Sequence, residues 1–234
     1  LLLAEIFQQE LPPGVLNVIS GYGEECGEPL LSHPDVRKIT FTGSFNVGKI
    51  IAQKAAPKLC PVTLELGGKN PNIIMSDADL DIAIPGVIDG MRYTRQGQAC
   101  TAGSRVYIQE KIYDKVLDGV VDRLKYLKMG NALDENSDIG AIISEEQLNR
   151  TLHYMNIAKE NSSTKVLHGG NQKRGNDYKE GFFYEPTLLS GVPVVSPVCQ
   201  EEIFGPVACA IPFKSFDEVI KSANDTPFGL SAVL

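Results

Sequence analysis

The chain has 234 residues, of which 43% are hydrophobic and 22% charged, a composition typical of globular proteins. Lys and Arg number 22 against 29 Asp and Glu, so the net charge is -7; without a basic tract, this disfavours a nucleic-acid partner. No apolar run approaches the roughly 20 residues that a membrane-spanning helix needs, so no membrane partner is expected.

The first part of the chain predicts helices and short strands in alternation. A helix near the start is stopped by Pro12-Pro13-Gly14, and a later one ends at Pro57. The expected elements are a helix over 1–10, strands over 15–19 and 36–41, a glycine turn over 43–48, a helix over 47–56 and a strand over 62–66. Residues 1–10 read as the later part of an apolar helix, so we expect an internal fragment, and a targeting peptide before it is not excluded.

A composition break at Gly67-Gly68 predicts a domain boundary between residues 1–66 and 67–234. Beyond it we expect strands over 72–75 and 105–109, a helix from Asp77 through Ile88 that Pro85-Gly86 kinks or interrupts, an amphipathic helix over 112–127, a helix over 144–159 opened by a Ser144–Gln147 capping box, and a surface loop over 169–181. Strands alternating with helices predict an α/β fold with mostly parallel pairing.

The chain has five cysteines, an odd number, and their spacing is not that of a metal site. They are Cys26, Cys60, Cys100, Cys199 and Cys209. Zinc and a secreted disulfide framework are both disfavoured, and a reducing compartment is expected. The scattered His33, His153 and His168 form no ligand set, so no metal is proposed.

The segment Phe41–Lys49 places Gly43, Ser44 and Gly48 between a predicted strand and a predicted helix. Glycines let the backbone approach a phosphate, and a helix N-terminus offers free N–H groups and a positive dipole. The segment is neither G-x-G-x-x-G nor a nucleotide P-loop. A dinucleotide role and an ordinary strand–turn–helix connection therefore both stay open.

Glu65 lies in an alternating strand and precedes Gly67-Gly68. Apolar neighbours would desolvate its carboxyl group, which favours a general base. The alternative is a glutamate on the exposed face of an edge strand. The glycine pair weakens this alternative because it marks a close backbone approach.

Small residues surround Cys100 in the segment Gln96–Arg105. They leave room for a substrate and let backbone N–H groups point at it, and an attacking thiolate needs a lowered pKa and an open approach. The alternative, a buried structural cysteine, fits Cys60 and Cys209 better.

The segment Gln200–Val207 combines Glu201 and Glu202 with Phe204 and a Gly-Pro turn. Paired carboxylates beside an aromatic ring could bind ribose hydroxyls and brace a planar ring. Taken alone, a charged loop before a strand is the better interpretation.

In their order, spacing and residue identities, these four segments together resemble the aldehyde dehydrogenase superfamily, whose NAD(P)-dependent members oxidise aldehydes to acids. Residues 224–230 also resemble a late family segment, so the resemblance runs through nearly the whole chain. It implies that residues 1–66 are the C-terminal part of a Rossmann-type dinucleotide-binding domain. Residues 67–234 would then be most of an α/β catalytic domain, incomplete at its C-terminus.

The resemblance also assigns residue roles. Cys100 would be the nucleophile and Glu65 the general base. The remaining assignments are Gly43, Ser44 and Gly48 along the cofactor pyrophosphate, Glu202 on the nicotinamide ribose, Phe204 against the nicotinamide, and Asn224 in structural support of the active site.

The implied reaction starts with attack of the Cys100 thiolate on the aldehyde to give a thiohemiacetal. Hydride transfer to the nicotinamide leaves a thioester, which water activated by Glu65 hydrolyses to the acid. Acylating relatives, which transfer the product to coenzyme A, commonly lack a glutamate here, so that chemistry is the alternative. An inactive fragment and a crystallin-like structural relative are further alternatives.

The choice between NAD and NADP is not readable, because the residues that separate the two lie upstream of residue 1 in the family. The asparagine that supplies a second oxyanion donor lies upstream as well. The resemblance implies a small-molecule aldehyde as substrate and a homodimer or homotetramer. We also expect an intracellular location. The cytoplasm is the first choice, and the mitochondrial or plastid matrix is the alternative.

Overall fold

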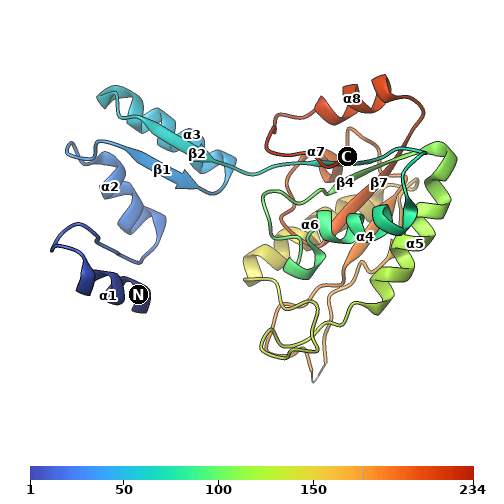
Figure 1. The fold of residues 1–234 in the computed structure, drawn as a ribbon, viewed down its shortest axis with the longest axis horizontal. Helices are drawn as coiled ribbons and strands as arrows, with labels where there is room; N and C mark the ends of the chain where they lie inside the picture. Colours follow the sequence, from blue (N-terminus) through green and yellow to red (C-terminus); the bar gives the residue numbers. More distant parts are fainter. Residues whose placement is uncertain (176) are drawn as a thin grey trace. The chain divides into compact units, whose positions relative to one another are not determined.

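The computed structural model describes residues 1–175 and 177–234 and divides into two compact units, Leu1–Leu66 and Gly67–Leu234 (Figure 1). Each unit contains both helices and strands, which confirms the predicted α/β class. Among the described residues, no helix combines the length and the apolarity needed to cross a bilayer.

The first unit is built on two short parallel strands. Its elements are α1 (Leu2–Glu10), a π-helical turn (Gly23–Gly27), α2 (Glu28–Ser32), β1 (Ile39–Thr42), α3 (Phe45–Ala55), a 3₁₀ turn (Ala56–Lys58) and β2 (Val62–Glu65). Ile39 lies opposite Val62, and Thr42 lies opposite Glu65. The last residues of both strands therefore lie at the same edge of the sheet.

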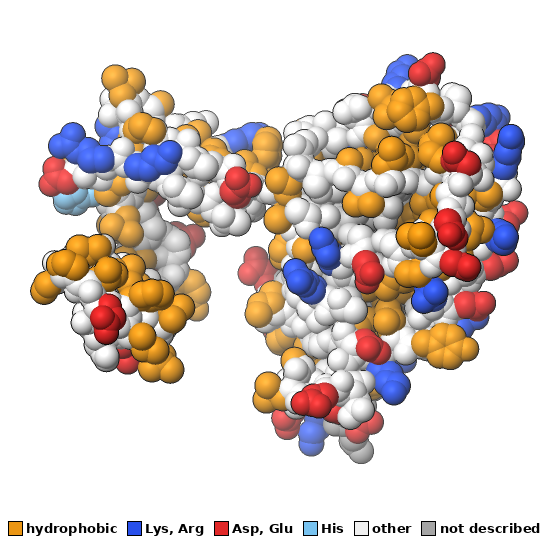
Figure 2. Space-filling model, viewed as in Figure 1, with side chains coloured by type: hydrophobic (Ala, Val, Ile, Leu, Met, Phe, Trp, Pro, Cys, Tyr) orange, Lys and Arg blue, Asp and Glu red, His pale blue; other side chains and the backbone are white. Residues whose placement is uncertain are grey.

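The strand predicted over 15–19 is wrong, because this segment has no regular structure. An extended segment becomes a strand only when a neighbour accepts its backbone hydrogen bonds, and the sheet of this unit contains β1 and β2 alone. Val15, Val18 and Ile19 are exposed. Figure 2 shows hydrophobic side chains gathered on the surface of this unit, where α1 exposes Leu2 and Phe7.

The second unit contains a five-stranded sheet in the order β3-β4-β7-β6-β5. Its elements are β3 (Pro71–Ile74), α4 (Leu80–Gly90), a 3₁₀ turn (Tyr93–Arg95), β4 (Arg105–Gln109), a 3₁₀ turn (Glu110–Ile112), α5 (Tyr113–Tyr126), α6 (Glu145–Glu160), β5 (Lys165–His168), β6 (Thr187–Ser190), α7 (Pro197–Gln200), β7 (Val207–Phe213) and α8 (Phe216–Asn224). Within the described part of the chain, β5–β6 is the one antiparallel pair among the strands of this sheet, which confirms mostly parallel pairing.

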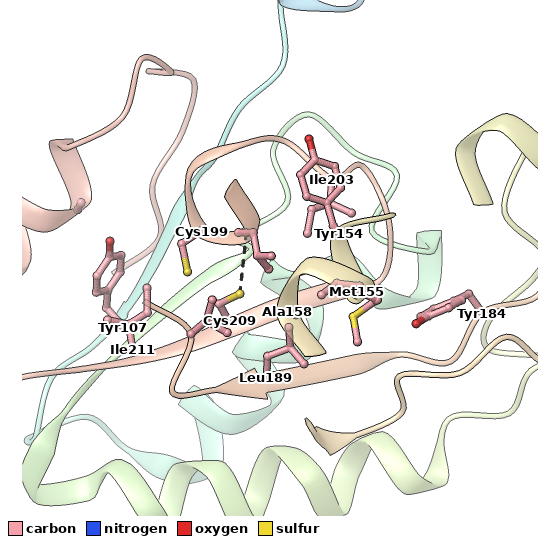
Figure 3. Packing of buried hydrophobic residues seen from close by; sticks show 14 of the residues in the cluster. Tyr107, Tyr154, Met155, Ala158, Tyr184, Leu189, Cys199, Ile203, Cys209 and Ile211 are labelled. Atoms are coloured by element: carbon pink, nitrogen blue, oxygen red, sulfur yellow. Dashed lines mark hydrogen bonds between the residues drawn. The ribbon is translucent and has the colours of Figure 1, made fainter. Parts of the chain in front are cut away.

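Hydrophobic side chains cover both faces of this sheet. Val106 and Ile108 pack on one face with residues of α4 and α5, and Tyr107 points to the other. On that second face, Figure 3 shows Met155 of α6 lying over Leu189 of β6. A buried, mostly parallel sheet with helices on both faces is a rigid support for the loops at its edges.

Helix α4 differs from the prediction in two ways. Its cap is Asp79 and not Asp77, since the Asp79 carboxylate accepts the Asp81 N–H at 3.0 Å. The helix also runs through Pro85 to Gly90 without the expected interruption. A mid-helix proline costs about 3 kcal/mol, whereas burying Val87 and Ile88 contributes about 1.5–3 kcal/mol for each side chain. Packing therefore outweighs the proline.

Helix α6 begins as the capping box predicts. The Ser144 hydroxyl accepts the Gln147 N–H at 3.2 Å. This cap fixes where α6 starts, and the first turns of α6 carry residues that contact the candidate site.

Candidate functional site

Four of the predicted site residues belong to the first unit, and three of them, Gly43, Ser44 and Glu65, meet at one edge of its sheet. The Gly43 N–H donates to the Glu65 carbonyl at 3.0 Å, and Ser44 follows as the N-cap of α3. Ligands of α/β proteins bind outside the carboxyl ends of parallel strands. The glycine turn and the predicted base are thus placed together where a ligand would bind.

Ser44 and Gly48 make contacts that seat α3. The Ser44 hydroxyl accepts the Val47 N–H at 3.3 Å. Gly48 is buried, and a Cβ there would come within 2.6 Å of Leu66 Cδ2. A larger residue at this position would require the Leu66 side chain to move, so Gly48 has a packing reason to be glycine.

The expected desolvation of Glu65 is wrong within this unit. Its side chain is exposed, whereas Val62 and Leu64 are half-buried. Alternate residues of a strand point to opposite faces, and Glu65 falls on the outer face of β2. The apolar neighbours in the sequence therefore belong to the other face and do not shield the carboxylate.

Cys100 lies in the second unit on a half-buried turn that leads into β4. Gly97, at the start of this turn, is buried and has a φ of +63°, which favours glycine. A Cβ at Gly97 would come within 2.7 Å of the Gly205 carbonyl carbon. Glycine at this position therefore lets the Cys100 turn lie against the loop that carries Glu202 and Phe204.

The Asn70 side chain holds the backbone of the Cys100 turn by hydrogen bonds. Its Nδ2 donates to the Cys100 carbonyl at 2.7 Å and to the Ala102 carbonyl at 3.1 Å, and its Oδ1 accepts the Ser231 N–H at 3.0 Å. Sequence reasoning passed over Asn70. The only signal was its place directly after the Gly-Gly-Lys run.

Glu202 reaches the Gly67-Gly68 pair. Its Oε1 accepts the Gly68 N–H at 3.2 Å, and a Cβ on Gly67 would overlap the carboxylate. Burial raises the pKa of Glu202 above that of an ordinary glutamate. The Glu202 carboxylate is therefore held against the glycine pair, Gly67-Gly68.

Phe204 has a left-handed backbone with a φ of +57°. This conformation costs about 1–2 kcal/mol in a residue other than glycine. The Gln147 amide donates to the Ile203 carbonyl at 2.9 Å and to the Phe204 carbonyl at 2.8 Å, and Arg150 donates to the Glu202 carbonyl. Hydrogen bonds from α6 thus hold the loop, a role of Gln147 and Arg150 that sequence reasoning missed.

A narrow cleft joins these parts of the second unit. Glu202 and Phe204 line it together with Gly68 and with Ala99 and Ala102, the near neighbours of Cys100. The structure therefore brings Glu202 and Phe204 beside the Cys100 turn. Among the described residues, no group of His, Cys, Asp and Glu is arranged to hold a metal ion.

Two buried basic residues, Lys69 and Arg105, adjoin cleft-lining residues in the sequence. The Lys69 side chain is 1% exposed, and its Nζ has no hydrogen-bond partner among the described residues. Burial lowers the pKa of Lys69. The fully buried Arg105 donates to the Lys69 carbonyl and to the Ala223 carbonyl, both at 2.8 Å. Arg105 thereby ties the end of α8 to the strand that follows the Cys100 turn.

Asn224 ends α8, and its Nδ2 donates to the Ile220 carbonyl of the same helix at 2.8 Å. The segment after Asn224 reaches the site through Ser231, which Asn70 binds. Support of the active site by Asn224 itself stays a prediction.

Comparison with known proteins gives a consistent result. A family model described as "Aldehyde dehydrogenase family" matches residues 1–234. A curated relative, the candidate aldehyde dehydrogenase DhaS of Bacillus subtilis (strain 168), is 43% identical over 235 residues, which cover 100% of this chain and 46% of the relative. The chain thus spans about half the length of this curated relative.

Solved structures agree. An NAD+ complex of an aldehyde dehydrogenase from Bacillus cereus matches with a TM-score of 0.90 and 40% identity, over 95% of this chain and 44% of that chain. A betaine aldehyde dehydrogenase from Staphylococcus aureus in complex with NAD+ matches with a TM-score of 0.91 and 38% identity, again over 95% and 44%. The fold class expected from the resemblance is confirmed by these similarities.

Proposed function

The chain belongs to the aldehyde dehydrogenase family, and from that premise we propose that the whole protein oxidises an aldehyde to a carboxylic acid with NAD(P)+. One observation carries the proposal: the half-buried Cys100 turn lies against a cleft lined by Glu202 and Phe204. A nucleophile beside a site for ribose and a planar ring matches the needs of aldehyde oxidation. The solved relatives that bind NAD+ add support.

The residues present fit the cofactor. A side chain at Gly67 would overlap the Glu202 carboxylate, so the glycine pair leaves this carboxylate room in the cleft. Glu202 would hold the nicotinamide ribose, Phe204 would contact the ring, and Gly43, Ser44 and Gly48 would lie along the pyrophosphate. Bound NAD(P)+ supplies the hydride acceptor. Both NAD and NADP stay within the proposal.

Cys100 is the proposed nucleophile. Its thiolate attacks the aldehyde carbon, and the Cys100 backbone N–H would donate to the oxyanion that forms. Loss of hydride from this adduct leaves a thioester on Cys100. The small side chains on both sides of Cys100, Ala99 and Thr101, leave the sulfur open to a substrate.

Glu65 is the proposed general base that activates water to hydrolyse the thioester. Its exposure within the first unit suits this role, because a carboxylate that moves protons needs access to water. The alternative is transfer of the acyl group to coenzyme A. A crystallin-like structural role is the alternative outside enzymology, and the presence of both Cys100 and Glu65 argues against it.

The test is aldehyde-dependent formation of NAD(P)H by the whole protein, followed by absorbance with and without free coenzyme A. We expect turnover without coenzyme A. Turnover that requires coenzyme A would replace the hydrolytic proposal by the acylating one. No turnover with any of a panel of aliphatic, aromatic and betaine-type aldehydes would contradict both.

Gly67→Ala is expected to raise the KM for NAD(P)+ about tenfold, which corresponds to about 1.4 kcal/mol of lost binding. The added methyl group would overlap the Glu202 carboxylate, which must then leave its position on the Gly68 N–H. Steady-state kinetics at varied cofactor concentration measure the effect.

The matched control is Gly86→Ala in α4, where an added Cβ meets no atom within 4 Å. We expect this variant to keep the wild-type KM and to gain about 0.5–1 kcal/mol of stability, since alanine favours a helix. Equal KM values for Gly67→Ala and the wild type would contradict the proposal that the Glu202 carboxylate, held against the glycine pair, binds the cofactor.

As the pH is lowered, cofactor binding is expected to weaken at a higher pH than it would if Glu202 had the pKa of an ordinary glutamate. Burial raises the pKa of Glu202, so this carboxylate takes up a proton at a higher pH and then accepts ribose hydroxyls poorly. The KM for NAD(P)+ should therefore rise as the pH falls, and Glu202→Gln should remove this dependence. A pH profile that is the same in both proteins would contradict the role of Glu202.

The whole protein is further proposed to form a homodimer or homotetramer and to act inside the cell. The cytoplasm is the first choice of compartment, and a mitochondrial or plastid matrix is the alternative. The partner it needs for chemistry is a small-molecule aldehyde.

A further inference from the structure

We propose that Asn70 is the positioning residue of the nucleophile: its carboxamide fixes the backbone of Cys100 and so the direction in which the sulfur points. The inference rests on the proposed function, because it takes Cys100 as the nucleophile. Asn70 touches neither substrate nor cofactor in this account and acts through Cys100.

The contacts use the whole carboxamide. One nitrogen, Nδ2, donates to the carbonyls of Cys100 and Ala102, at 2.7 and 3.1 Å. The oxygen Oδ1 accepts the Ser231 N–H at 3.0 Å. Because the oxygen is committed to a backbone donor, the nitrogen must face the two carbonyls, and the orientation of the amide is determined by its partners.

The surroundings are built around this amide. Asn70 is 2% exposed, so the loss of its hydrogen bonds would leave buried carbonyls unsatisfied. A Cβ on Gly68 would come within 2.7 Å of the Cys100 carbonyl oxygen and 2.6 Å of Asn70 Oδ1. The glycine two residues before Asn70 therefore leaves the space in which the amide and the Cys100 carbonyl meet.

The consequence for chemistry follows from backbone geometry. With its carbonyl held, Cys100 loses rotation about its Cα–C bond, and the Cα–Cβ bond keeps one direction relative to the sheet. The second anchor at Ala102 fixes the turn on the other side. A shift of about 1 Å in a reacting atom can lower a rate about a hundredfold, so a support at this position has a measurable effect.

The chain offers a matched control in Asn72. It lies two residues further along the chain, within β3, is 3% exposed, and its Nδ2 has no hydrogen-bond partner among the described residues. Asn72→Ala therefore removes the same kind of buried side chain two residues away without breaking a hydrogen bond to the Cys100 turn.

The decisive variant is Asn70→Asp in the whole protein. Aspartate keeps the shape and the oxygen that accepts the Ser231 N–H, but it cannot donate to the carbonyls of Cys100 and Ala102. We expect kcat to fall about ten- to a hundredfold while the KM for NAD(P)+ stays unchanged, and Asn72→Ala to keep the wild-type kcat. Asn70→Ser, which can still donate one hydrogen bond, should give an intermediate kcat.

A second measurement does not depend on turnover. Hydrogen–deuterium exchange of the backbone amides in residues 98–104 should become faster in Asn70→Asp and in Asn70→Ser than in the wild type, and stay unchanged in Asn72→Ala. If Asn70→Asp fails to fold, Asn70→Ser carries both readouts.

The inference is overturned if the Asn70 variants keep a wild-type kcat, if Asn72→Ala lowers kcat equally, or if exchange in residues 98–104 does not change. Cys100→Ala is measured alongside to separate the two proposals. Full activity of Cys100→Ala would remove the proposed function, whereas an inactive Cys100→Ala beside a fully active Asn70→Asp would remove only the role of Asn70.

Discussion

Replacing Cys100 by alanine is expected to lower aldehyde-dependent NAD(P)H formation by about four orders of magnitude, to the background rate. The reaction proposed here begins with a covalent bond between the Cys100 sulfur and the aldehyde carbon, and alanine cannot form it. The loss should appear in kcat, because the cleft lined by Glu202 and Phe204 does not depend on the sulfur. Initial rates at saturating cofactor and aldehyde measure it.

Cys60→Ala is the matched control. Cys60 is a free, half-buried cysteine like Cys100, but it precedes β2 and has no proposed role. We expect wild-type kinetics from it. If Cys100→Ala kept a normal rate, or if Cys60→Ala abolished turnover, the assignment of the nucleophile would be wrong.

Replacing Glu65 by glutamine is expected to separate the two halves of the reaction. The isosteric amide cannot accept a proton from water, so the thioester should form and then persist. Rapid mixing should show one equivalent of NAD(P)H per active site, followed by a steady-state rate about 10²–10⁴-fold below wild type. The burst and the slow phase are both read from NAD(P)H absorbance.

Glu10→Gln provides the comparison for Glu65, since it removes an exposed carboxylate of the same unit without a proposed role. It should leave both phases unchanged. A wild-type steady-state rate in Glu65→Gln would refute the base assignment. Loss of the burst would show that Glu65 acts before the thioester forms.

Much of the fold is predictable from local patterns. The spacing of apolar residues predicted α5, the glycine turn and Pro57 marked out α3, and the Ser144–Gln147 capping box predicted the start of α6. Local patterns failed where pairing or packing decides. The segment 15–19 is apolar enough for a short strand but pairs with no strand of its unit, and α4 continues through Pro85 because its far end is buried.

The candidate site was predictable to the extent that its residues lie in recognisable segments. Cys100 came from one motif and Glu202 and Phe204 from another, and the last two line a cleft beside the Cys100 turn. Their supports were not predictable, because Asn70 and Gln147 act through hydrogen bonds to the backbone of distant segments. Such contacts leave no periodic pattern in a sequence.

The exposure of Glu65 could not be read correctly either. A strand residue among apolar neighbours is buried or exposed according to the face on which it falls and to what covers that face. The alternation of β2 puts Glu65 on the outer face, and a sequence does not show what lies over it.

Mass spectrometry of the trapped intermediate tests the central claim most directly. Glu65→Gln protein is mixed with NAD(P)+ and an aldehyde, quenched in acid and digested. The account predicts an added acyl group on the peptide that contains Cys100, absent when cofactor is omitted and cleared within one turnover in the wild type. An acyl group on any other residue, or none on Cys100 despite a full equivalent of NAD(P)H, would contradict it.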